Sequence, residues 1–156
     1  MSPRPQPHTR SDYPHFLAIT TRWLDNDAYG HVNNVVYYAY FDTVVNQFLI
    51  ENGVLQVETS PVIGLVVETQ CRYFSPITFP DTVWAGLRVA HLGGSSVRYE
   101  VGLFRNVDQL AAAQGHFVHV YVEREGRRPV GVPDAMRRLL QTLQSSPSSE
   151  TRSDHS

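Results

Sequence analysis

One long apolar segment constrains the fold of this 156-residue chain more than any other feature. It covers residues 35–50, and twelve of these sixteen residues are apolar. Valine, tyrosine and phenylalanine favour strands, but the segment is too long for one typical strand. Its four polar residues fall at helical spacing in one narrow stripe (Asp42, Thr43, Asn46 and Gln47). We therefore predict a helix over residues 35–50 that other elements cover on most sides.

The other apolar segments have the composition of strands. They cover residues 16–23, 61–74, 82–91, 96–104 and 110–123, and they are separated by turns rich in proline, glycine and asparagine. This spacing predicts that the last four strands form an antiparallel meander. A short helix is expected to begin at Pro133-Asp134 and to reach Leu143. The order of elements predicts an α+β domain in which a curved antiparallel sheet of about five strands wraps one long central helix.

The two ends of the chain are too polar to be buried. Residues 1–12 and 145–156 are predicted to be disordered tails, which leaves residues 13–144 as a single domain. The first tail lacks the apolar core of a signal peptide, and no stretch reaches the ~18 apolar residues of a membrane helix. The one cysteine, Cys71, cannot form an internal disulfide. These features predict a cytoplasmic protein without a membrane partner.

The charge of the chain excludes several partners and chemistries. The net charge of -2 gives no reason to expect nucleic acid or an anionic membrane as a partner. All thirteen basic residues are arginine, which excludes lysine catalysis and suits the binding of phosphate groups. Five of them lie close together in sequence (Arg124, Arg127, Arg128, Arg137 and Arg138). They either form a solvated, partly ion-paired surface or contact the phosphates of a ligand.

A dense group of polar residues comes directly before the predicted helix. Between Asp25 and Asn34 lie two carboxylates, an imidazole, a glycine and three carboxamides. A helix cap uses one or two polar residues, so this string predicts a functional site. The first backbone N–H groups of a helix are free and carry a partial positive charge. The Asp27 carboxylate is therefore expected to lie near donors that can stabilise a developing oxyanion, whereas Asp25 is expected to hold the loop by hydrogen bonds.

Other candidate sites are weaker. His116 and His119 are three residues apart on a predicted strand, so their side chains should lie on opposite faces and cannot bind one ion. We predict no metal site. Gly93-Gly94 is expected to form a hairpin turn, because no helix follows it. Cys71 lies in an apolar strand and is expected to be an inert thiol.

The string before the helix resembles the signature of one enzyme family. Asp-x-Asp-x-x-Gly-His-Val-Asn-Asn-x-x-Tyr, at residues 25–37, is similar to the motif of hotdog-fold acyl-CoA thioesterases of the 4-hydroxybenzoyl-CoA thioesterase family. Phe-Ser-Pro at residues 74–76 and Arg-Pro-Val at residues 128–130 resemble the family again. The resemblance implies a hotdog fold. It also implies hydrolysis of a thioester to a carboxylic acid and free CoA, with no metal or organic cofactor.

The resemblance also assigns roles to residues. Asp27 matches the catalytic carboxylate, which acts either as the nucleophile or as the general base for water. Asn34 matches the position whose backbone N–H polarises the thioester carbonyl. His31 matches a histidine of related acyl-carrier-protein thioesterases and is expected either to act in catalysis or to orient Asp27. Three further residues of the string are expected to bind substrate (Tyr29, Gly30 and Asn33).

The expected partners follow from the same resemblance. They are an acyl-CoA, or a thioester of an acyl carrier protein, and one or three further copies of this chain in a homodimer or homotetramer. Two other functions remain open: a hotdog hydratase of enoyl or hydroxyacyl thioesters, and a non-catalytic acyl-CoA binding module. The acyl group is not predicted. The aromatic residues at positions 29, 37, 38, 40 and 41 either line an aryl pocket or, as we favour for most of them, pack the helix.

Overall fold

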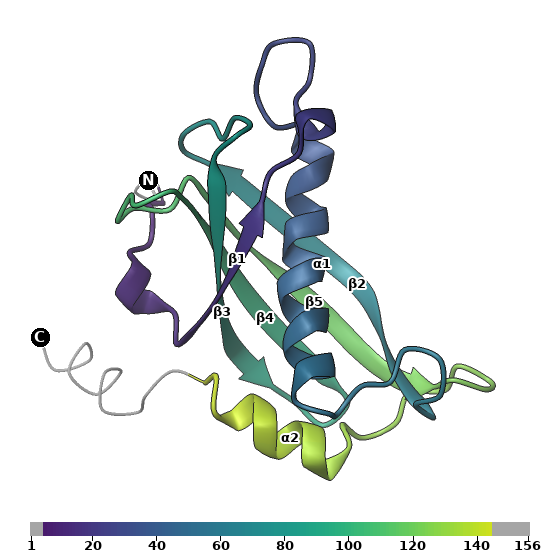
Figure 1. Ribbon diagram of the computed structural model, residues 1–156. Helices are drawn as coiled ribbons and strands as arrows, with labels where there is room; N and C mark the ends of the chain where they lie inside the picture. The colour runs from purple at the N-terminus through teal and green to yellow at the C-terminus, as the bar shows by residue number, and fades with distance from the viewer. Residues whose placement is uncertain (1–4, 145–156) are drawn as a thin grey trace, which may run out of the picture.

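A five-stranded antiparallel sheet forms the body of the protein. The computed structural model describes residues 5–144. The strands are β1 (His15–Thr20), β2 (Val62–Tyr73), β3 (Thr82–Leu92), β4 (Ser96–Arg105) and β5 (Ala113–Glu123). Their order in the sheet is β1-β3-β4-β5-β2 (Figure 1). This architecture confirms the predicted α+β class and the number of strands.

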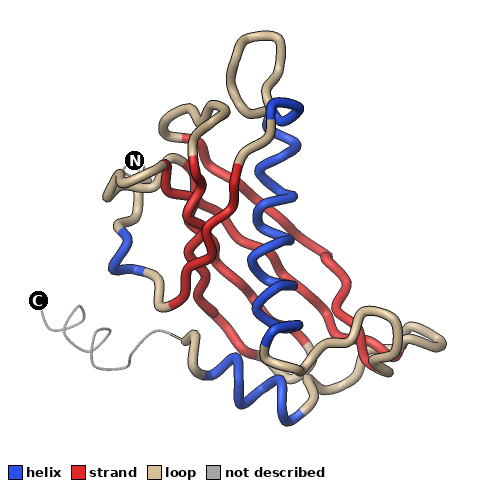
Figure 2. Tube along the Cα trace, in the orientation of Figure 1, coloured by secondary structure: helices blue, strands red, loops and turns tan. Residues whose placement is uncertain are grey.

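The long helix α1 (Asn34–Glu51) lies along one face of this sheet (Figures 1 and 2). It extends the predicted range by one residue at each end. Its buried side chains pack into one core with the inward-facing residues of the strands, and the largest of them include Tyr40, Phe41 and Phe48. The tyrosines at positions 37 and 40 both belong to this core. The opposite side of α1, which includes Asp42 and Thr43, is exposed in the single chain.

The position of β2 differs from the predicted meander. β3, β4 and β5 pair in sequence order as expected, but β2 pairs with β5 at the edge of the sheet. A meander would place β2 beside β3. That edge of β3 is instead occupied by β1, which the sequence pattern did not place. The connection from β2 to β3 therefore passes the start of α1, where the Val32 N–H donates to the Ile77 carbonyl at 2.7 Å.

The segment before β1 differs from the predicted disordered tail. Residues 5–13, here called the strap, are described and lie on the face of the sheet opposite α1. The Tyr13 ring packs over Gly86 and Gly102, where an added Cβ would come within 2.6–2.9 Å of ring or Cβ atoms of Tyr13. The Tyr13 hydroxyl also contacts His8 Nδ1 at 2.7 Å. The strap has few apolar groups, but it packs on the sheet because two glycines leave room for its one aromatic ring.

Other boundaries show smaller differences. β1 ends at Thr20 rather than at position 23, because residues 23–25 form a short 3-10 turn. β5 begins at Ala113, three residues later than predicted. The terminal helix α2 (Asp134–Gln141) buries Met136 at the end of the sheet where α1 finishes (Figure 1). The predicted tails at residues 1–4 and 145–156 lie outside the described residues. Within residues 5–144, no helix is long and apolar enough to cross a membrane.

Candidate active site

The loop between β1 and α1, residues 21–33, is held in place by Asp25. The Oδ2 atom of Asp25 accepts hydrogen bonds from the Arg22 backbone N–H at 2.8 Å and the Tyr40 hydroxyl at 3.0 Å. Its Oδ1 atom lies 2.9 Å from the Arg22 guanidinium. Burial alone would raise the pKa of Asp25, but these hydrogen bonds outweigh it and leave the pKa below its ordinary value. Asp25 therefore anchors the loop, as predicted.

Asp27, two residues later, forms the open part of the same loop. Its Oδ1 atom accepts hydrogen bonds from the backbone N–H of Tyr29 at 2.8 Å and, more weakly, of His31 at 3.4 Å. Gly30 closes this turn with φ +81°, a conformation that favours glycine. Within the described residues, no group donates a hydrogen bond to Asp27 Oδ2. One carboxylate oxygen is thus fixed by the backbone, and the other is available for chemistry.

The first turn of α1 supplies the donors next to this carboxylate. Asn33 is the helix cap, and its side-chain oxygen accepts a hydrogen bond from the Val35 N–H at 3.0 Å. Asn34 is the first helical residue, so its backbone N–H has no acceptor within the helix. No other acceptor for that N–H is found among residues 5–144. The start of α1 therefore offers one free donor and the partial positive charge of the helix end.

A cleft of about 430 Å³ brings most of the predicted residues together. Asp27, Tyr29, His31 and Asn34 all line it, whereas Gly30 and Asn33 do not. Those two residues instead shape the turn and cap the helix. The cleft volume lies within the usual range for small-molecule sites. The predicted carboxylate and the predicted helix start thus face the same space.

The opposite wall of the cleft comes from the end of β2 and the residues that follow it. Tyr73, Phe74, Ser75 and Pro76 line this wall. The Tyr37 ring of α1 meets the Tyr73 ring edge-on, with 4.9 Å between the ring centres. Sequence reasoning found the Phe-Ser-Pro motif only as a family likeness and gave it no role. Its position depends on the pairing of β2 with β5, which no local pattern reveals.

The two strand histidines lie on opposite faces of β5, as predicted. His116 Nε2 contacts Glu68 at 2.5 Å on the face away from α1. His119 packs against Tyr99 on the helix side, and neither of its ring nitrogens has a hydrogen-bond partner among the described residues. Burial lowers the pKa of His119 to about 4. Among residues 5–144, no three His, Cys, Asp or Glu side chains gather where they could hold a metal ion.

The arginines near the C-terminus are mostly used within the chain. Arg124 donates to the carbonyl of Ser60 at 2.7 Å, and Arg137 donates to the carbonyl of Gly93 at 2.9 Å. Arg128 pairs with Glu123 at 2.9 Å. These contacts favour the structural alternative for the three residues. They leave Arg127 and Arg138 as the members of the group without a described polar side-chain contact.

The fold and the cleft define a class of protein. An antiparallel sheet with one long helix on its face, and a carboxylate at the N-terminal end of that helix, is an α+β domain of the hotdog type. The chain belongs to the thioesterase-like superfamily, whose family model matches residues 21–140. This match begins directly after β1 and includes the whole loop before α1, α1 itself and β2–β5.

Three solved structures place the chain among known folds. The PA5185 protein of Pseudomonas aeruginosa is 56% identical over 91% of this chain and 99% of its own, with a TM-score of 0.88. The PA2801 protein of the same organism is 31% identical over 81% and 97%, with a TM-score of 0.76. A thioesterase of Thermus thermophilus, solved with coenzyme A and zinc, is 30% identical over 86% and 97%, with a TM-score of 0.72. Together with the family match, these likenesses support thioester hydrolysis as the general activity.

Proposed function

We propose that the protein hydrolyses an acyl-CoA to a carboxylic acid and free CoA, with Asp27 as the catalytic carboxylate. One observation carries this proposal: Asp27, with one carboxylate oxygen free of hydrogen bonds from the described residues, and Asn34, the first residue of α1, line the same cleft. The resemblance of residues 25–37 to 4-hydroxybenzoyl-CoA thioesterases supports the same assignment. A coenzyme A complex of one structural relative supports CoA as the leaving group.

The geometry fits two routes, each with its own tetrahedral intermediate. In the first, Asp27 attacks the thioester carbonyl, the C–S bond breaks, and CoA leaves as the thiol once protonated; water then cleaves the mixed anhydride. In the second, Asp27 takes a proton from water, and the resulting hydroxide attacks the carbonyl directly; the C–S bond then breaks, and the proton passes to the leaving thiolate. In both routes negative charge develops on the carbonyl oxygen, and the Asn34 N–H at the positive end of α1 stabilises it.

We assign the His31 ring a role that does not depend on a hydrogen bond between the ring and the Asp27 carboxylate. The His31 backbone N–H contacts the Asp27 carboxylate, but the His31 ring makes no hydrogen bond within the described residues. The exposed ring lines the cleft, where it can orient substrate or pass a proton to the leaving thiolate. Tyr29 lines the same cleft and is 86% exposed, so its ring is available to a substrate or a second subunit.

A homodimer or homotetramer fits the surface of the single chain. β2 is an edge strand of twelve residues, and Val66 and Val67 on it are 47% and 60% exposed. Long, apolar, unpaired edges are rare on proteins that remain monomeric. Val35 at the start of α1 is 74% exposed as well. A second copy of the chain packed against these residues would cover them. A reducing compartment, the cytoplasm, suits the unpaired Cys71.

Release of free thiol from a panel of acyl-CoAs tests the activity and its carboxylate together. Asp27→Asn should lower kcat/KM by about 10²–10⁴-fold, because the amide can accept the turn hydrogen bonds but cannot act as base or nucleophile. Asp42→Asn is the matched control, since Asp42 lies on the exposed side of α1 and outside the cleft. It should keep wild-type turnover. Wild-type turnover in a folded, correctly assembled Asp27→Asn protein would refute the assignment.

A single turnover in ¹⁸O-labelled water detects the nucleophilic route when water attacks the Asp27 carbonyl of the anhydride. If Asp27 is the nucleophile and water attacks its carbonyl in the anhydride, label enters the Asp27 side chain and the product carries one unlabelled oxygen from it. If Asp27 is the general base, label enters only the carboxylic acid. Mass analysis of the peptide that contains Asp27 reads the difference directly, and labelled peptide excludes a pure general-base route.

A further inference from the structure

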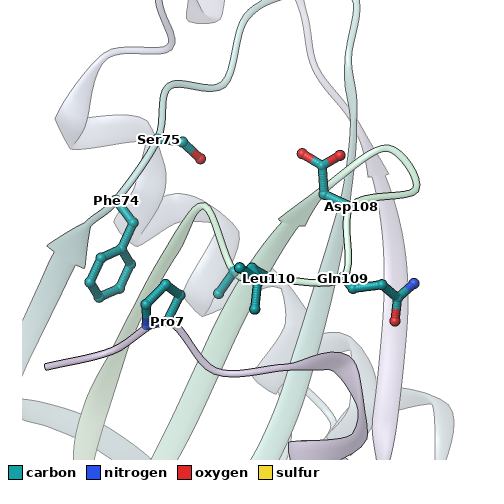
Figure 3. Close-up of a pocket in the computed structure, with 7 residues that line it drawn as sticks. Pro7, Phe74, Ser75, Asp108, Gln109 and Leu110 are labelled. Atoms are coloured by element: carbon teal, nitrogen blue, oxygen red, sulfur yellow. The ribbon is translucent and has the colours of Figure 1, made fainter.

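A second hollow adjoins the cleft on the far side of the Phe74-Ser75 segment. It has a volume of about 420 Å³ and lies between the strap, the end of β2 and the connection from β4 to β5 (Figure 3). Phe74 and Ser75 line both this hollow and the cleft that contains Asp27. Pro7 and Leu110 face it from the other two segments (Figure 3). We call this space the strap hollow.

The walls of the strap hollow are held by backbone contacts. The Ala111 N–H donates to the His8 carbonyl of the strap at 2.9 Å. The Arg10 guanidinium donates to the Asp108 carbonyl at 2.7 Å, which ties the strap to the β4–β5 connection. On the other side, the Phe74 N–H donates to the Ala112 carbonyl at 2.8 Å. The hollow is therefore formed by segments that are joined to one another, a preorganised shape rather than a loose gap.

The residues that line the strap hollow suit the apolar acyl chain of an acyl-CoA better than its phosphates. Its wall is largely apolar and includes Pro7, Phe74 and Leu110. Its charged lining residue is Asp108, an anion, and none of its lining residues is basic. The phosphates of CoA would find no partner there. A neighbouring hollow, also bounded by Phe74, contains Arg72, whose guanidinium has no ion-pair partner among residues 5–144.

We propose that the strap hollow binds the acyl chain of the substrate, and that Leu110 limits the length of chain that it accepts. This inference rests on the proposed thioesterase function, because it places the reacting carbonyl in the cleft beside Asp27. The acyl chain then passes Phe74 and Ser75 and buries its methylenes against Pro7 and Leu110. The pantetheine and the nucleotide leave the carbonyl in another direction.

Chain-length specificity tests the proposal. The measured quantity is the ratio of kcat/KM for octanoyl-CoA to that for acetyl-CoA, from thiol release by the assembled full-length protein. Each methylene buried in the hollow should raise kcat/KM by about fourfold in the wild type. Leu110→Trp should fill the hollow and lower the ratio by at least about tenfold. Leu110→Ala should enlarge it and raise the ratio of dodecanoyl-CoA to octanoyl-CoA.

Val107→Trp is the matched control. Val107 lies in the same connection, is 84% exposed and does not line the hollow, so this variant should keep the wild-type ratio. Equal losses on both substrates in Leu110→Trp would mean that the hollow holds the pantetheine arm and would overturn the proposal. An unchanged ratio in both Leu110 variants would also overturn it, while leaving the thioesterase function intact. Absence of thiol release by the wild type from every acyl-CoA would instead refute the proposed function and this inference with it.

Discussion

Two halves of one loop use the same residue type for different purposes. In the first half, the Asp25 carboxylate is 1% exposed, and both oxygens accept hydrogen bonds from Arg22 or Tyr40. In the second half, Asp27 uses one oxygen to close a turn and leaves the other to the cleft. A carboxylate is therefore available for chemistry only when its structural partners leave one oxygen unused. Variants of Asp25, Asp27 and Tyr40 test this difference between a structural and an available carboxylate.

Exchanging each aspartate for asparagine should separate stability from activity. Asp25→Asn should lower the free energy of unfolding by about 2–3 kcal/mol, because one buried oxygen becomes an NH₂ that faces donors. Asp27→Asn should change it by less than about 0.5 kcal/mol, since the amide oxygen still accepts from the turn. Urea unfolding of both variants measures the difference. Equal losses in the two variants would contradict the division between anchor and site.

Acid should remove the stabilisation that Asp25 provides. The pKa of Asp25 is lower in the folded protein than the ordinary value of about 3.9 for an unfolded chain. Its contribution to stability is therefore complete above that ordinary value and is lost as the pH falls through the folded pKa. The free energy of unfolding, measured from pH 6 to pH 2, should fall less steeply below about pH 4 in Asp25→Asn than in the wild type.

Loss of the hydrogen bond from the Tyr40 hydroxyl of α1 to Asp25 should lower the free energy of unfolding by less than Asp25→Asn does. Tyr40→Phe removes one hydrogen bond to Asp25 Oδ2 but leaves that oxygen paired with the Arg22 N–H. We expect a loss of about 1–2 kcal/mol in the free energy of unfolding, less than in Asp25→Asn. In a double-mutant cycle, Tyr40→Phe combined with Asp25→Asn should show a coupling energy, because the two residues share one bond. Simple additivity would mean that the hydroxyl acts elsewhere.

Local sequence patterns predicted the elements of this protein well. The helix over residues 35–50 appears as Asn34–Glu51, because a long apolar segment with one polar stripe has no other comparable way to be buried. The loop that lines the candidate cleft was also predicted from sequence, since its polar residues are contiguous and precede a helix. Asp27, Tyr29, His31 and Asn34 share one cleft for that reason.

The errors came from contacts between distant residues. β2 pairs with β5, which lies about fifty positions later in the chain, and strand patterns do not encode the choice of partner. The packing of the strap likewise depends on distant residues, because the Tyr13 ring lies over Gly86 and Gly102, which are far from it in sequence. A polar terminal segment can therefore pack on the fold when the sheet has a hollow that accepts one of its side chains.

The amino-acid sequence by itself determined the class of elements, the buried helix and the carboxylate at its start, because these depend on residues that are neighbours along the chain. Only the tertiary structure shows that residues 73–76 form the opposite wall of the cleft, and that the strap and Leu110 bound a second hollow. These features arise where segments from opposite ends of the chain meet. Their positions follow from sheet pairing and core packing, which are properties of the whole fold rather than of any local pattern.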